Sequence, residues 1–188
     1  MCVFAGSSFG SRPEYGAAAA GLGRALAARR HTLVYGGGRV GLMGVLADAA
    51  LAAGGRVIGV IPEALEQLEV AHQGLSELRV TATMHERKAL MAELSAAVVA
   101  LPGGFGTLDE LFEILTWNQL GFCAKPFGLL DVADYYARLL AHLDHAVAER
   151  FLQPAHRALV ICRSSAVELL DALDDAIVPS VDKWLDRT

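Results

Sequence analysis

The stretch AAVVALPGGFGTLDELFE, residues 96–113, joins an apolar run to a glycine-rich turn and then to a helical pattern. An unbroken apolar run of this length is typical of a strand that is buried on both faces of a parallel sheet. Pro102 and the glycines that follow end the strand, and Leu108, Leu111, Phe112 and Leu115 then recur at helical spacing. A strand followed by a turn and a helix is half of a βαβ unit. The stretch therefore predicts an α/β protein.

The same alternation continues along the chain. The segments that read as strands are Cys2–Ala5, Thr32–Tyr35, Arg56–Ile61, Leu78–Thr81, Ala97–Leu101, Phe127–Leu130 and Leu159–Ile161. The segments that read as helices are Pro13–Arg30, Gly41–Ala53, Met84–Leu94, Leu108–Leu120, Tyr135–Arg150 and Ala166–Asp175. This order predicts a doubly wound, mostly parallel, Rossmann-like sheet with helices on both faces. Because no linker or repeat divides the chain, we expect residues 1–188 to form a single domain.

Composition restricts the classes of function. The chain has 188 residues and a formal net charge of −5, which argues against a general nucleic-acid binder. No apolar run approaches the ~20 residues of a membrane span, and the N-terminus lacks the pattern of a secretory signal. The cysteines at 2, 123 and 162 are scattered and have no metal-ligand spacing. We therefore expect a cytoplasmic protein without membrane or nucleic-acid partners.

Glycines and hydroxyl groups follow several of the predicted strands. In doubly wound sheets, ligands bind beyond the carboxyl ends of the strands. Segments 6–8, 36–41, 83–88 and 103–107 would meet at that edge, and the candidates there include Ser7, Gly37, Met84 and Gly103. Glycine turns let backbone N–H groups approach an anion, although each could instead be a tight turn that needs positive φ. The pattern favours a phosphate-like ligand, but it is neither a Walker loop nor a dinucleotide fingerprint.

Thr107 and Glu110 allow two interpretations. Their spacing at the start of a predicted helix spells a capping box, in which Thr107 caps the helix and Glu110 reaches back. An acid beside a glycine turn can also be catalytic. The residues alone leave both roles open.

Arg87 and Lys88 lie in the first turn of a predicted helix, where the helix dipole disfavours cations. A bound phosphate would supply the missing negative charge. Alternatively, the two residues form an exposed pair balanced by Glu86 or Glu93. No third ligand accompanies His142 and His145, so we expect neither a metal nor a cofactor.

Four segments occur in an order that resembles the Lonely Guy family. They are Gly6-Ser7-Ser8, the glycine-rich residues 35–44, Met-His-Glu-Arg-Lys at 84–88, and Pro-Gly-Gly-Phe-Gly-Thr-Leu-Asp-Glu at 102–110. The resemblance covers about residues 2–130. It implies a Rossmann-like homodimeric cytokinin riboside 5′-monophosphate phosphoribohydrolase, a class often mislabelled as lysine decarboxylase. Such an enzyme hydrolyses the N-glycosidic bond of adenosine-type monophosphates to the free base and ribose 5-phosphate.

The resemblance also implies roles for individual residues. Arg87 and Glu110 are the catalytic pair. The resemblance implies further substrate contacts at Glu69, Lys88, Gly104, Phe105, Gly106, Thr107 and Thr116. Either Glu69 or solvent would protonate the leaving base. The alternative is a non-catalytic carrier of a nucleotide or a molybdopterin-type cofactor in the same pocket.

Overall fold

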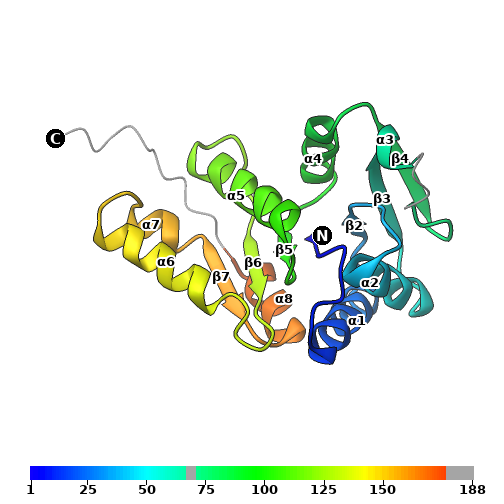
Figure 1. The fold of residues 1–188 in the computed structure, drawn as a ribbon, viewed down its shortest axis with the longest axis horizontal. Helices are drawn as coiled ribbons and strands as arrows, with labels where there is room; N and C mark the ends of the chain where they lie inside the picture. Colours follow the sequence, from blue (N-terminus) through cyan, green and yellow to red (C-terminus); the bar gives the residue numbers. More distant parts are fainter. Residues whose placement is uncertain (67–70, 177–188) are drawn as a thin grey trace.

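The computed structural model describes residues 1–66 and 71–176, which form one α/β unit around a seven-stranded sheet. The strands pair in parallel in the order β4-β3-β2-β1-β5-β6-β7 (Figure 1). Their bounds are β1 Cys2–Phe4, β2 Leu33–Tyr35, β3 Val57–Pro62, β4 Glu77–Thr81, β5 Val98–Ala100, β6 Phe127–Leu130 and β7 Val160–Arg163. The predicted fold class and every predicted strand are confirmed.

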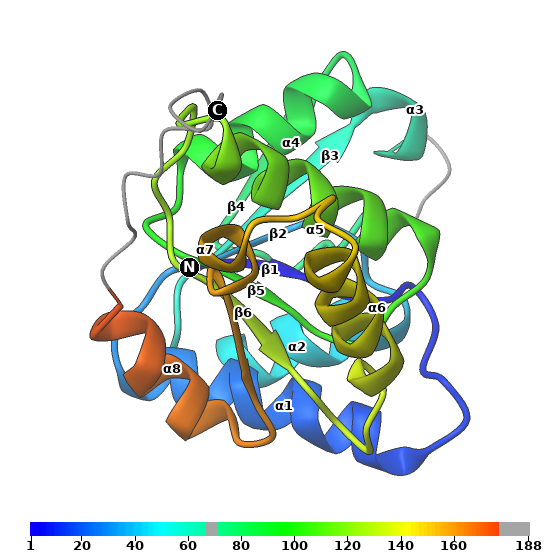
Figure 2. The ribbon, with the colours of Figure 1, turned by 90° about the vertical axis from the view of Figure 1, so that its left-hand side faces the viewer.

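Helices cover both faces of this sheet. Helices α1 (Pro13–Ala28), α2 (Gly41–Ala52) and α8 (Ala166–Asp174) lie on one face. Helices α4 (Met84–Glu93), α5 (Phe105–Gln119), α6 (Ala137–Ala148) and α7 (Pro154–Arg157) lie on the other face (Figure 2). The sequence pattern missed α7 and α3 (Glu63–Glu66), because four residues are too few to show a helical period.

Two hydrophobic clusters fill the space between the sheet and these helices. One packs strand residues such as Val3 and Tyr35 against α1, α2 and α8. The other packs Phe4 and Phe127 against α4, α5 and α6. Burial on both faces explains why the central strands are apolar throughout rather than alternating.

The strand order places a reversal of direction at the centre of the sheet. The chain moves outward from β1 to β4 and then returns to β5, which pairs with the other side of β1. The connections leaving β1 and β5 therefore diverge and open a crevice at their carboxyl ends. Among the described residues, no helix combines the length and apolar character needed to cross a membrane.

Candidate active site

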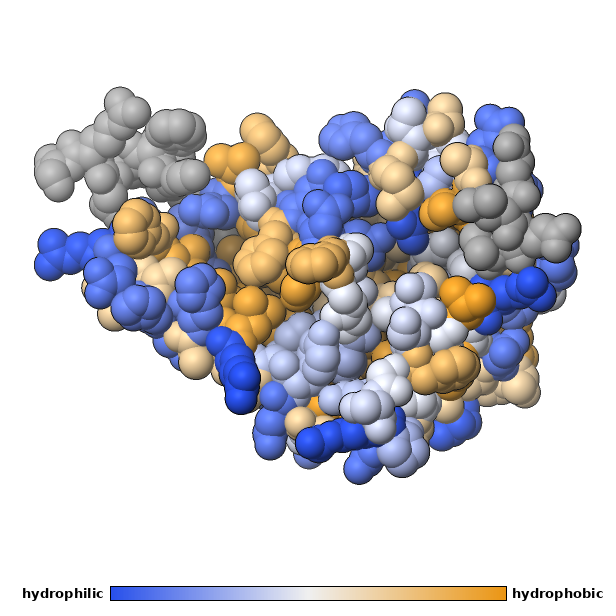
Figure 3. All heavy atoms as spheres, in the orientation of Figure 1, coloured by the Kyte–Doolittle hydropathy of each residue, from blue (hydrophilic) through white to orange (hydrophobic). Residues whose placement is uncertain are grey.

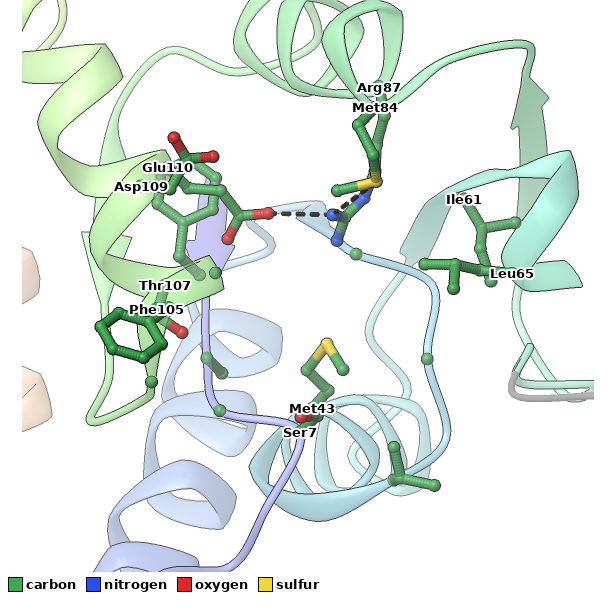
Figure 4. A pocket seen from close by; sticks show the side chains of 18 of the residues that line it. Ser7, Met43, Ile61, Leu65, Met84, Arg87, Phe105, Thr107, Asp109 and Glu110 are labelled. Carbon is green, nitrogen blue, oxygen red and sulfur yellow. Dashed lines mark hydrogen bonds and ion pairs between the residues drawn. The ribbon is translucent and has the colours of Figure 1, made fainter. Parts of the chain in front are cut away.

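A cavity of about 420 Å³ occupies this crevice (Figure 4). Its walls come from the ends of β1 and β3, the loop after β2, the first turn of α4 and the start of α5. Segments distant in sequence thus meet at one edge of the sheet, as the glycine and hydroxyl pattern predicted.

A buried ion pair crosses the cavity. Nη1 of Arg87 on α4 lies 3.0 Å from Oε1 of Glu110 on α5, and each side chain is only 9% exposed. The Nε–H of Arg87 also donates to the carbonyl of Val60 at 3.1 Å. Burial raises the pKa of Glu110 above its usual value, while the neighbouring Arg87 charge opposes that rise. The site therefore holds a carboxylate whose protonation is sensitive to its partner.

Local sequence fixes where Arg87 points. Thr83 caps α4 by accepting the Glu86 N–H at 3.1 Å, and the Glu86 carboxylate accepts the Ala82 N–H at 3.0 Å. The cap sets the first turn of α4, from which Arg87 descends toward the cavity (Figure 4). Its guanidinium lies against Gly36, where an added Cβ would be 1.9 Å from Nη2. Gly36 is thus a glycine that makes room for a side chain.

The glycine turn after β5 is held in place by hydrogen bonds that the carbonyl groups of residues 101–103 accept. The Tyr136 hydroxyl donates to the Leu101 carbonyl at 2.6 Å, the Gly6 N–H donates to Pro102 at 3.1 Å, and the Tyr135 hydroxyl donates to Gly103. The cap residue Gly104 and the first residues of α5, Phe105 to Thr107, follow this turn and line the cavity. The first N–H groups of a helix have no partner within the helix and favour negative charge. This end of the cavity suits a phosphate.

The predicted capping box of Thr107 and Glu110 is wrong. Helix α5 begins at Phe105, three residues earlier than predicted, and its cap residue is Gly104. Thr107 and Glu110 consequently lie inside the helix, both nearly buried. The apolar periodicity begins only at Leu108, so the pattern concealed the first turn.

The alternative interpretation of Arg87 and Lys88, an exposed pair balanced by Glu86 or Glu93, is also wrong. Arg87 pairs with Glu110, and the Lys88 ammonium lies 2.9 Å from Asp109 and 3.0 Å from Glu113. These carboxylates belong to α5 and are distant in the sequence. They supply the negative charge that was predicted to come from a bound phosphate.

The other predicted site residues divide into three groups. Those that line the cavity with Arg87 and Glu110 are Ser7, Met84, Gly104, Phe105, Gly106 and Thr107. Three more residues adjoin the cavity without lining it: Gly37, Lys88 and Gly103. Gly37 has φ +72°, as expected for the tight turn that the sequence offered as its alternative role. Thr116 faces the other side of α5, where its hydroxyl donates to the Phe112 carbonyl at 2.7 Å. Glu69 lies outside the described residues.

Sequence reasoning missed the apolar wall of the cavity. Val40, Ile61 and Leu65 line it together with Met43 and Met84, and in Figure 4 Ile61 and Leu65 lie across the cavity from Glu110. The available signal was their position at the ends of predicted strands: Val40 and Leu65 follow β2 and β3, and Ile61 lies near the end of β3. Apolar residues there resemble ordinary core. One side of the cavity is thus apolar and the other is polar.

The fold and the cavity define a Rossmann-like α/β protein with a cavity at its topological switch point. A family model described as "Possible lysine decarboxylase" matches residues 43–173. The chain is 54% identical over 162 residues to a cytokinin riboside 5′-monophosphate phosphoribohydrolase of Rhodococcoides fascians, covering 86% of this chain and 82% of the relative. It is 51% identical over 177 residues to a probable cytokinin riboside 5′-monophosphate phosphoribohydrolase of Oryza sativa subsp. japonica, covering 94% of this chain and 78% of the relative. The chain belongs to this family, the Lonely Guy family.

A solved structure shares the fold at lower identity. The molybdenum cofactor carrier protein of Chlamydomonas reinhardtii superposes with a TM-score of 0.69 at 23% identity, covering 92% of this chain and 94% of the carrier. At this identity the likeness supports the fold alone.

We predict that Gly36→Ala inactivates the site without unfolding the protein. The new methyl group would occupy the position of the Arg87 guanidinium and displace it from Glu110. We expect a fall of ~10²-fold in kcat/KM for AMP, because misplacing a catalytic group by about 1 Å has effects of that size. The matched control is Gly21→Ala on α1, where no atom lies within 4 Å of the added Cβ and activity should be unchanged. Wild-type kcat/KM in Gly36→Ala would show that the Arg87 position does not matter.

Proposed function

We propose that this protein hydrolyses the N-glycosidic bond of adenosine-type 5′-monophosphates, including cytokinin riboside 5′-monophosphates. The products are the free base and ribose 5-phosphate. The observation that carries this proposal is the buried Arg87–Glu110 pair inside a cavity with one end suited to a phosphate and one apolar end. Relatives about half identical to this chain bear the name of this activity.

The two ends of the cavity orient the substrate. The phosphate lies against the N–H groups at the start of α5, those of the cap residue Gly104 and of Gly106, with the hydroxyls of Ser7 and Thr107 near it. The base then lies against the apolar wall of Met43, Ile61, Leu65 and Met84, which also accepts a hydrocarbon substituent on the base. In this orientation the ribose lies between the two ends, beside Glu110.

Glu110 is the catalytic carboxylate of the proposed mechanism. Breaking the bond between C1′ and the base leaves an oxocarbenium-like ribose, as in glycoside hydrolysis. An ionised carboxylate beside C1′ stabilises this cation and can take a proton from the attacking water. The water oxygen bonds to C1′, and the bond electrons leave with the base, which takes up a proton.

Arg87 holds the carboxylate and fixes the ribose phosphate. Its Nε–H is used by Val60 and one Nη by Glu110, so the guanidinium cannot rotate freely. Its remaining N–H groups can donate to the substrate. Lys88, which is bound between Asp109 and Glu113, supports α4 beside Arg87.

The alternative function is a carrier that holds a phosphorylated cofactor in this pocket without cleaving it. A phosphate-binding turn serves both functions, but a buried acid beside the position of C1′ serves only cleavage. The curated relatives also favour the hydrolase, whereas the likeness to the molybdenum cofactor carrier supports only the shared fold.

The test is release of the free base by purified protein, adenine from AMP and adenosine and isopentenyladenine from isopentenyladenosine monophosphate, with the wild type and Glu110→Gln compared. We expect cleavage of both monophosphates and much weaker cleavage of adenosine, because each lost charge-assisted hydrogen bond costs roughly 1.5–3 kcal/mol. Glu110→Gln keeps an oxygen for Arg87 but loses the charge, so kcat should fall by ~10²-fold or more.

Glu168→Gln, in the first turn of α8 on the other face of the sheet, is the control and should match the wild type. Equal cleavage of adenosine and AMP would disprove the phosphate assignment. Near-normal turnover of Glu110→Gln would remove Glu110 from the mechanism. Tight nucleotide binding without any base release would favour the carrier.

We further propose that the protein is a homodimer that pairs through α5. Phe105 is 93% exposed and Phe112 is 39% exposed, and hydrophobic residues gather over α5 and toward α6 (Figure 3). A shallow depression on this face is lined by Phe105, Leu108, Asp109, Phe112, Glu113, Thr116 and Trp117. An apolar patch of this kind is typical of a subunit interface, and twofold pairing would cover both copies at once.

Light scattering at micromolar concentration tests the dimer. The chain has a mass of 19.9 kDa, so a particle of twice this mass is expected. Phe112→Asp should shift the mass toward the monomer, because it buries a charge at the interface. Val167→Asp, at an exposed apolar position on α8, is the matched control. A wild-type particle of one chain mass would refute the dimer.

A further inference from the structure

Lys125 ties the end of α4 to the end of α5, outside the cavity. Its ammonium donates to the carbonyls of Ala92 and Ser95 at the carboxyl end of α4. Its backbone is held by Asn118 on α5: the Asn118 amide donates to the Lys125 carbonyl at 2.8 Å, and the Lys125 N–H donates back at 3.2 Å. Asn118 is itself buried. We call these three contacts, at Ala92, Ser95 and Asn118, the Lys125 joint.

The joint places a cation at the end of α4, where the Ala92 carbonyl also accepts the Ser95 N–H at 3.1 Å. The last carbonyls of an α-helix have no intrahelical partner and carry partial negative charge, so a cation there is favourable. The Ser95 hydroxyl adds a bond to the Met91 carbonyl at 2.9 Å. The end of α4 is thus fixed by one side chain from the connection between α5 and β6.

The position of α4 matters because the catalytic pair spans two helices. Helix α4 packs on β3 and β4, whereas α5 packs on β1. Arg87 belongs to the first helix and Glu110 to the second, and their contact is a single N–O distance of 3.0 Å. Ala92 lies five residues beyond Arg87, about 7.5 Å along the helix axis. A shift at the end of α4 therefore moves Arg87.

We propose that Lys125 is a positioning residue for the hydrolase reaction. It sets the spacing of α4 and α5 and so keeps Arg87 against Glu110, although it touches neither the cavity nor the catalytic pair. This inference rests on the proposed function, because it assigns Lys125 to the same reaction.

The experiment compares Lys125→Met and Lys125→Arg with the wild type, using AMP hydrolysis from pH 4 to 8. Lys125→Met keeps the apolar stem but loses the ammonium. We expect kcat to fall about tenfold, by the sensitivity of catalysis to small misplacements. The acid limb of the pH profile should move to higher pH, because a more distant Arg87 opposes the rise in the pKa of Glu110 less. Lys125→Arg can still donate to the Ala92 and Ser95 carbonyls, so it should recover most of the wild-type kcat and most of the wild-type position of the acid limb.

A purely structural role would lower the amount of folded enzyme without moving the pH profile. Arg157→Met, which removes an ion pair with Asp144 on the surface, is the control and should leave the acid limb in place. Hydrogen exchange provides a readout that does not depend on activity: α4 amides should exchange faster in Lys125→Met while β1 and β5 stay protected.

A folded Lys125→Met with wild-type kcat, acid limb and α4 exchange would overturn the proposal. If that variant does not fold, Lys125→Gln, which keeps a donor but loses charge and reach, is judged by the same three readouts. A wild-type protein that releases no base would defeat the proposed function instead, and the exchange result would still decide whether Lys125 holds α4.

Discussion

The buried ion pair between Arg87 and Glu110 is the interaction on which the site depends. The two side chains are 9% exposed, and each group compensates the other's loss of water. Several other residues hold the Arg87 guanidinium in place beside Glu110. Val60 accepts from the guanidinium, Gly36 leaves space for it, and the Thr83 cap sets the helix from which it descends. The strand order brings these elements together at the divergence of β1 and β5.

The polar and apolar walls of the cavity follow from the same topology. Each wall is formed by residues at or just after the end of a strand. The glycine turn after β5 contributes backbone N–H groups, and the residues at and after the ends of β2 and β3 contribute apolar side chains. A single cavity can then bind a phosphate at one end and a base at the other. The carboxylate of Glu110 faces the space between them (Figure 4).

Much of this could be predicted from the sequence, because parallel strands buried on both faces leave continuous apolar runs that glycine and helix patterns interrupt. The strands, the major helices and the convergence of Arg87 and Glu110 on one edge were predicted in this way or from the family resemblance. The partners of Lys88 could not be predicted, since Asp109 and Glu113 lie more than twenty residues away and pair with it only through the fold. The start of α5 at Phe105 was hidden because its first turn has almost no apolar pattern.

The most direct experiment asks whether Glu110 is the carboxyl group that controls the reaction. The pH dependence of kcat/KM for AMP would be measured beside the titration of the Glu110 carboxyl by NMR, assigned through Glu110→Gln. If Glu110 is the catalytic carboxylate, the profile has one acid limb whose apparent pKa lies above the value of about 4.3 for an exposed glutamate and agrees with the Glu110 titration. A rate that stays constant below that value, or a limb that does not follow the Glu110 signal, would contradict it.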